Sequence, residues 1–127
     1  MITRQEITKG QEIPADLEPL LADYLERINK LRAVYGKPML ITSGYRSREH
    51  NAKIGGSPNS AHCVCQAADF ADSSAELKNW LLQNIAVLTA CELYCEDFSA
   101  TPTWVHIQSR PVASGNRIFK PGVPGAP

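Results

Sequence analysis

A long stripe of apolar residues near the N-terminus places the strongest constraint on the fold. Over residues 13–36, apolar side chains recur at steps of three and four positions: Leu17, Leu20, Leu21, Tyr24, Leu25, Ile28 and Leu31. This spacing is typical of an amphipathic helix with one core-facing surface. Pro14 suits the first turn of such a helix, and Gly36 followed closely by a proline suits its end. We therefore expect a long helix that packs against the rest of the chain.

Three further regions have patterns typical of strands. Two are short and bounded by turn-forming residues: Met39 to Thr42 and Ala67 to Ala71. In the third region, "CELYCEDF" and "TWVHIQ" alternate apolar and polar side chains and are joined by "SATP", which predicts two strands that could pair as a hairpin. Ser73 and Glu76 have the spacing of a capping box, so another helix is expected to start there.

The order of these elements predicts a single α+β domain over residues 1–127, with a small, mostly antiparallel sheet flanked by helices. Between the first two strand regions lie one helical turn and a long loop rich in Gly, Ser, Pro and Asn. Loops of this kind in small domains are usually functional or mobile. The tail, residues 112–127, is predicted to be irregular.

Charge and hydropathy disfavour several classes of function. Lys and Arg together number 13, as do Asp and Glu, so the basic excess of a nucleic-acid binder is missing and no nucleic-acid partner is expected. The apolar runs are too short to predict a membrane span. The first ten residues contain no apolar segment of a signal peptide, which predicts synthesis in the cytoplasm. We expect a monomer.

Alternation along the predicted strands places several possible metal ligands on one surface. In "TWVHIQ" the valine and the isoleucine share the core face, so His106 lies on the opposite face. Phe70 is expected to face the core, so its neighbour Asp69 faces away from it. In the other strand of the hairpin, Glu96 lies on the non-core face and could be close to His106.

These residues could form a metal site if the preceding loop brings His62 to the same surface. Two histidines and one carboxylate are a catalytic zinc set, which leaves a fourth position open for water. A second carboxylate nearby, Glu96, would serve as the general base. Taken singly, each residue also has an ordinary structural interpretation, such as a buried histidine or a turn-forming aspartate. The prediction therefore depends on their joint placement on one face.

The four cysteines offer an alternative metal site. Cys63 with Cys65, and Cys91 with Cys95, have C-x-C and C-x-x-x-C spacings that loosely match the cysteine pairs of structural zinc sites. Disulfides are less expected without a secretion signal. Alternation places Cys91 and Cys95 in the core, away from His106. A thiolate of Cys63 or Cys65 close to the metal remains an open alternative.

Three spaced blocks resemble the zinc D-Ala-D-Ala carboxypeptidase family, peptidase M15, which includes phage endolysins and L-alanyl-D-glutamate peptidases. The blocks are "SGYRSREHNAKIGGSPNSAH", "HCVCQAAD" and "LYCEDFSATPTWVHIQ", and they cover roughly residues 40–108. Three blocks in the family order are a more specific signal than one short motif. The family signature S-x-H-x-x-G-x-A-x-D is matched at four positions: Ser60, His62, Ala67 and Asp69. The resemblance implies a Hedgehog/DD-peptidase-like fold.

The resemblance also implies roles for individual residues. One Zn²⁺ would be bound by His62, Asp69 and His106. Arg46, in the "GYRS" block, would hold the substrate carbonyl and the developing oxyanion. Three further side chains would line the substrate groove: Tyr45, Ser60 and Trp104.

Two positions depart from the family pattern. Many members carry the general base three residues before the last histidine, where this chain has Thr103. Phage-like members instead have it at the end of the preceding strand, which assigns Glu96, with Asp97 as the alternative. Cys65 stands where the signature has glycine, a residue that tolerates conformations closed to others, and cysteine would fit there if φ is negative.

The resemblance thus implies a zinc peptidase that acts on peptidoglycan stem peptides, as a D-Ala-D-Ala carboxypeptidase or as an L-Ala-D-Glu endopeptidase. Without a signal peptide, such an enzyme would suit a phage or prophage lysis protein released to the cell wall, and it would also suit a cytoplasmic bacterial enzyme that trims peptides. Because Thr103 replaces the usual glutamate, the alternative is a non-catalytic zinc-binding module of the same fold that binds cell wall or a protein partner.

Overall fold

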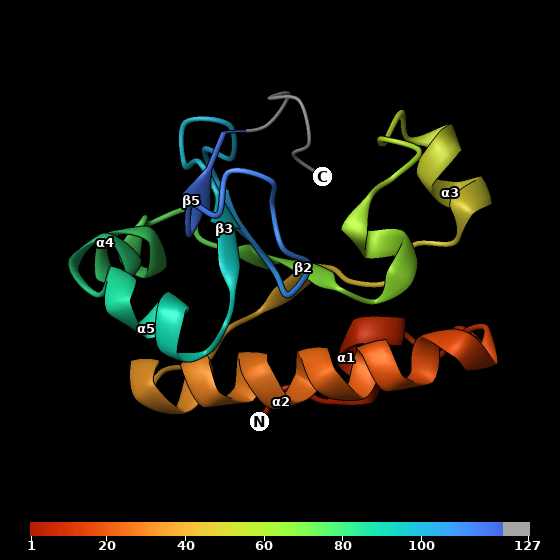
Figure 1. Ribbon diagram of the computed structural model, residues 1–127, viewed down its shortest axis with the longest axis horizontal. Helices are drawn as coiled ribbons and strands as arrows, with labels where there is room; N and C mark the ends of the chain where they lie inside the picture. Colours follow the sequence, from red (N-terminus) through yellow and green to blue (C-terminus); the bar gives the residue numbers. More distant parts are fainter. Residues whose placement is uncertain (121–127) are drawn as a thin grey trace.

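A computed structural model describes residues 1–120, which form a five-stranded sheet with helices around it (Figure 1). The order across the sheet is β1-β2-β4-β3-β5, and every pairing is antiparallel except that of β3 with β5. The strands are β1 (Ile41–Ser43), β2 (Ala67–Ala71), β3 (Tyr94–Glu96), β4 (Trp104–Gln108) and β5 (Ile118–Phe119). The predicted α+β class with a mostly antiparallel sheet is confirmed.

The helices differ in length and in how well they were predicted. They are α1 (Arg4–Thr8), α2 (Glu18–Tyr35), α3 (Arg48–Lys53), α4 (Glu76–Gln83) and α5 (Ile85–Ala90), with 3₁₀ turns η1 (Ala15–Leu17) and η2 (Ala61–Val64). No apolar pattern predicted α1, whose start is a capping box between Thr3 and Glu6. Within residues 1–120, no helix combines the length and the apolar character that a membrane span requires.

The long helix α2 is the one predicted from the apolar stripe, but it starts later than expected. A 3₁₀ turn precedes it, and Pro19 rather than Pro14 lies in its first turn. Proline has no N–H, so an α-helix that began near residue 13 would lose a hydrogen bond at Pro19. The helix ends as predicted at Gly36, whose φ of 75° is a left-handed conformation that suits glycine.

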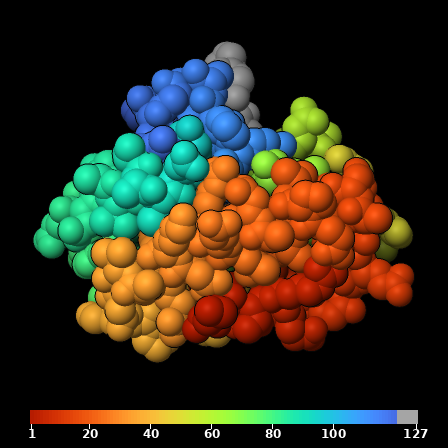
Figure 2. Space-filling model, turned by 60° about the horizontal axis from the view of Figure 1, so that its bottom comes forward, coloured from red at the N-terminus to blue at the C-terminus, as the bar shows by residue number. Residues whose placement is uncertain are grey.

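The core lies between α2 and one face of the sheet. Figure 1 shows α2 running beneath the strands, and in Figure 2 the first third of the chain, red to orange, covers most of this side of the molecule. The buried helix residues Tyr24 and Ile28 belong to one apolar cluster with Phe70 and Ile107 of the sheet. The hydroxyl of Tyr24 donates a hydrogen bond of 2.9 Å to the carbonyl of Ile107, which ties α2 to β4. The other face of β2 and β4 therefore carries the polar side chains.

Several strand boundaries differ from the prediction. β1 begins at Ile41, and Leu40 is exposed. The first strand of the hairpin is shorter than "CELYCEDF", because Cys91 caps α5 and Glu92 takes a positive φ of 56° before the chain extends. The tail predicted to be irregular contributes the short strand β5, and its residues 121–127 lie outside the described part.

The start of α4 was predicted wrongly. The expected capping box between Ser73 and Glu76 does not form, since no side chain caps the helix from the N-cap position, which is Ala75. Instead the buried carboxylate of Asp72 accepts hydrogen bonds of 2.9 Å from the backbone N–H groups of Leu77 and Lys78. A carboxylate satisfies two unpaired N–H groups at once and also faces the positive end of the helix, which favours it over a hydroxyl.

Replacing Asp72 by alanine is therefore expected to lower the free energy of unfolding by about 2 kcal/mol, because two buried N–H groups lose their acceptor. The matched variant Ser73→Ala should cost less than about 0.5 kcal/mol, since Ser73 is exposed and caps nothing. Urea unfolding followed by circular dichroism measures both. If both variants lost the same free energy of unfolding, Ser73 would cap the helix as the sequence predicted.

Candidate metal centre

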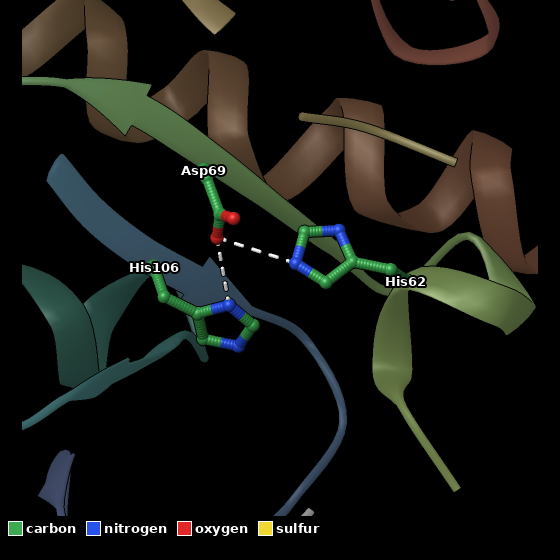
Figure 3. Close-up of side chains that lie close together, drawn as sticks. All are labelled: His62, Asp69 and His106. Carbon is green, nitrogen blue, oxygen red and sulfur yellow. Dashed lines mark hydrogen bonds and ion pairs between the residues drawn. The ribbon is translucent and has the colours of Figure 1, made fainter. Parts of the chain in front are cut away.

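Three side chains predicted as metal ligands converge on the sheet face that α2 does not cover (Figure 3). Asp69 in β2 pairs directly with His106 in β4, and His62 reaches them from η2. Their ligand atoms all lie within 4.8 Å of one another. Among the described residues 1–120, no other group of three or more His, Cys, Asp or Glu side chains is close enough to hold a metal ion.

Strand register creates the space for this cluster. Alternation along β2 and β4 brings Asp69 and His106 to the same face, and their pairing sets them opposite each other. On either side of this pair, Ala67 lies opposite Gln108 and Ala71 opposite Trp104. Gln108 and Trp104 thus each face an alanine of β2, which leaves room beside the Asp69–His106 pair.

His62 is held by backbone contacts on both sides. Its backbone N–H donates to the hydroxyl of Ser60 at 3.2 Å, and its carbonyl accepts from the N–H of Arg46 at 3.1 Å. The ring Nδ1 lies 2.7 Å from the carbonyl of Gly44 and must donate to it, so Nε2 is the atom that points toward Asp69 at 3.2 Å. Burial lowers the pKa of His62, which favours the neutral ring that a metal requires.

Gly44 is needed because two segments approach closely there. A Cβ at this position would lie 2.2 Å from the carbonyl oxygen of Ile7, far inside van der Waals contact. The N–H of Tyr45 donates to the same Ile7 carbonyl at 2.8 Å. The glycine of the "SGYRS" block therefore lets α1 pack against the segment whose carbonyl orients His62.

Asp69 is the ionised centre of the cluster. Burial alone would raise the pKa of its carboxyl group, but the imidazoles of His106 and His62 beside it outweigh burial and hold the pKa well below its ordinary value. Its Oδ1 lies 2.9 Å from Nδ1 of His106, and its Oδ2 lies 3.5 Å from Nη2 of Arg46. For His106, burial would lower the pKa, yet the bond to Asp69 raises it.

The donor set suits a metal ion. Two imidazole nitrogens and one carboxylate oxygen face one another, and imidazole with carboxylate is a common combination for transition metals. The outer nitrogens also have protein partners, since His62 contacts Gly44 and His106 contacts Gln108. Such outer hydrogen bonds are typical of metal-binding histidines.

The cluster forms one wall of a pocket of about 260 Å³. Of the predicted substrate-binding side chains, Ser60 and Trp104 line this pocket and Tyr45 does not. Tyr45 is partly buried and packs against the apolar core instead. Arg46 lines the pocket, and its Nε donates to the hydroxyl of Ser43 at 3.2 Å, which holds the guanidinium next to Asp69.

The two acidic candidates for the base have different surroundings. Glu96 lines the pocket, and burial is the main cause that raises its pKa above the ordinary value. Asp97 is outside the pocket lining and accepts hydrogen bonds from the hydroxyl and the backbone N–H of Ser99, which lower its pKa. A carboxylate with a raised pKa beside a metal site suits a general base better than one engaged in a turn.

The cysteines do not join the cluster. Cys91 and Cys95 are buried in the core, where burial raises the pKa of both thiols. Cys65 also lies in the core, and burial raises its pKa to about 11, so its thiol stays protonated. Its φ is 58°, which is left-handed, so the condition of a negative φ under which cysteine would fit easily is not met. This conformation explains why the family signature has glycine at the position.

Sequence patterns missed two polar residues that contact the site. Gln108 is completely buried, lies in the pocket lining and contacts His106. Its position two residues after His106 on the same strand face was the available signal. Asn51 is buried in α3 and lies between Arg46 and the loop, with its Nδ2 donating to the carbonyl of Ser57 at 2.7 Å. No sequence spacing pointed to Asn51.

Comparison with known proteins adds one match. A family model described as peptidase M15 matches residues 1–108, which is most of the chain and includes the whole cluster with Arg46 and Glu96. Neither the curated proteins nor the solved structures contain a significant match.

Proposed function

The chain belongs to the peptidase M15 family, and we propose that it is a zinc-dependent peptidase that cleaves the stem peptides of bacterial peptidoglycan. The observation that carries this proposal is the convergence of the three ligand-type side chains with Glu96 and Arg46 around one pocket. The family supports the peptidase activity, and the cluster supports it because its donor set is of the kind that could hold the metal such an enzyme needs.

In this mechanism His62 Nε2, His106 Nδ1 and a carboxylate oxygen of Asp69 would hold the zinc. When bound, zinc supplies a Lewis acid that activates water and polarises the scissile carbonyl. Glu96 accepts the proton of the attacking water and passes it to the leaving amine. The guanidinium of Arg46 binds the carbonyl oxygen and stabilises the negative charge that develops on it.

We further propose that the enzyme acts as a monomeric single domain and is released to the cell wall as a phage or prophage lysis protein. The bond cleaved is either the D-Ala-D-Ala bond at the end of the stem or the L-Ala-D-Glu bond near its start. Both offer a polar peptide with a nearby carboxylate, and Arg46 at the pocket wall is compatible with either.

Hydrolysis of defined muropeptides tests the function and names the bond. Purified protein is incubated with pentapeptide muropeptides and with intact peptidoglycan, and the products are identified by mass spectrometry. We expect release of either D-Ala or the peptide that begins with D-Glu, loss of activity with a chelator, and recovery with zinc. Cleavage that survives chelation would contradict the proposal.

A second function has one observation in its favour. Thr103 occupies the position where many members of the peptidase M15 family have the catalytic glutamate. The domain could therefore bind zinc and cell wall without turnover. One zinc per chain, binding to peptidoglycan and no product from any stem peptide would favour this module over the enzyme.

A further inference from the structure

We propose that Gln108 is a positioning residue that selects the ring nitrogen with which His106 binds the metal. The inference rests on the metal site of the proposed function. Gln108 follows His106 by two residues in β4, so both side chains lie on the same face of the sheet. The Gln108 side chain is completely buried, with 0% of its surface exposed, so its amide must find partners within the protein.

The two partners of this amide determine its orientation. On one side, Nε2 of Gln108 donates a hydrogen bond of 2.8 Å to the backbone carbonyl of Arg110. A carbonyl can only accept, so the NH₂ group of the amide must face Arg110 and the oxygen must face the other way. That oxygen, Oε1, lies 2.7 Å from Nε2 of His106.

The orientation of Gln108 in turn determines where His106 carries its proton. An amide oxygen only accepts, so Nε2 of His106 must donate to it. A ring that binds a metal through one nitrogen keeps an N–H only on the other, so a ring whose Nε2–H is held by Gln108 offers Nδ1 to a metal once the Nδ1 proton has left. Nδ1 is the atom that faces Asp69 at 2.9 Å and belongs to the ligand cluster.

The two histidines of the cluster are therefore set in opposite ways. In His62 the backbone carbonyl of Gly44 accepts a hydrogen bond from Nδ1–H, which leaves Nε2 for the metal. In His106 the side-chain oxygen of Gln108 accepts a hydrogen bond from Nε2–H, which leaves Nδ1 for the metal. Only the second acceptor can be removed by substitution. Without it, Nε2–H would be buried and unpaired, and the neutral ring would instead carry its proton on Nδ1, next to Asp69 and in the way of a metal.

The main test replaces Gln108 by methionine, which has similar length but neither accepts strongly nor donates. Zinc affinity is measured by competition with a chromophoric chelator, and we expect Gln108→Met to bind zinc about 10- to 100-fold more weakly than wild type. Gln108→Glu keeps an acceptor oxygen toward His106 and should bind more tightly than the methionine variant. Ser109→Ala, at a buried neighbour that does not contact His106, should leave the affinity unchanged.

A spectroscopic measurement separates positioning from folding. In zinc-loaded wild type, ¹⁵N spectra of the histidine rings should show His106 with its proton on Nε2 and the metal on Nδ1. Coordination through Nε2 would overturn the inference without any variant. Equal zinc affinity of wild type and Gln108→Met would overturn it as well, while leaving the proposed function intact. A wild-type protein that binds no zinc would instead overturn both.

Discussion

Replacing Asp69 by asparagine is expected to abolish stoichiometric zinc binding and, with it, hydrolysis. The carboxylate lies between the two imidazole rings and is the only anionic member of the cluster. Loss of an outer hydrogen bond to a ligand already costs about 10- to 100-fold in metal affinity, so loss of a charged ligand should cost more than 100-fold. Asparagine has nearly the same shape, so the change removes charge rather than volume.

Zinc content after dialysis against a weak chelator measures this effect, with muropeptide hydrolysis as the second readout. Asp23→Asn is a suitable control, because Asp23 is a half-exposed residue of α2 that pairs with Arg27 four residues on, away from the cluster. Circular dichroism of the metal-free proteins checks that both variants fold. Full zinc occupancy in Asp69→Asn would show that the metal binds elsewhere or not through this carboxylate.

Replacing Glu96 by glutamine is expected to lower kcat by about 10²- to 10⁴-fold, the usual contribution of a general base, while zinc binding remains. Glutamine has the same shape but cannot accept the proton of water. Since burial raises the pKa of Glu96, the wild-type rate should be full above that raised pKa and fall as the pH drops through it. In Glu96→Gln the residual rate should lack this acid limb.

The matched control is Asp97→Asn, the neighbouring acid that is bound to Ser99 and lies outside the pocket lining. It should keep near-wild-type kcat, with zinc content equal to that of Glu96→Gln. If Asp97→Asn were inactive and Glu96→Gln active, Asp97 rather than Glu96 would be the general base. Loss of zinc in Glu96→Gln would make Glu96 a ligand rather than a base.

Patterns that depend on neighbours in sequence were reliable for this chain. The period of two along "AADFA" and "WVHIQ" predicted the strands β2 and β4 and also which side chains face away from the core. The apolar stripe predicted α2 for the same reason, because helix periodicity is a local property. Three ordered blocks then indicated the family, which the match over residues 1–108 confirms.

Predictions were less reliable where two neighbouring residues could serve the same role. Ser73 and Asp72 are both able to cap α4, and the carboxylate wins because the chain turns so that it reaches two N–H groups. Local patterns also failed to predict the strand β5. It is only two residues long and pairs in parallel with β3, a partner more than twenty residues earlier, so no local pattern distinguishes it from a loop.

The sequence by itself determined the residue types of the site and the face of the sheet on which Asp69 and His106 lie, because side chains alternate along any strand. Only the tertiary structure decided that these two residues pair directly and that His62 reaches them from η2. It also decided which nitrogen each ring points toward the other ligands, since that depends on where the Gly44 carbonyl and the Gln108 side chain lie in the folded chain. Strand register and the placement of hydrogen-bond acceptors are properties of the assembled chain, and no local pattern contains them.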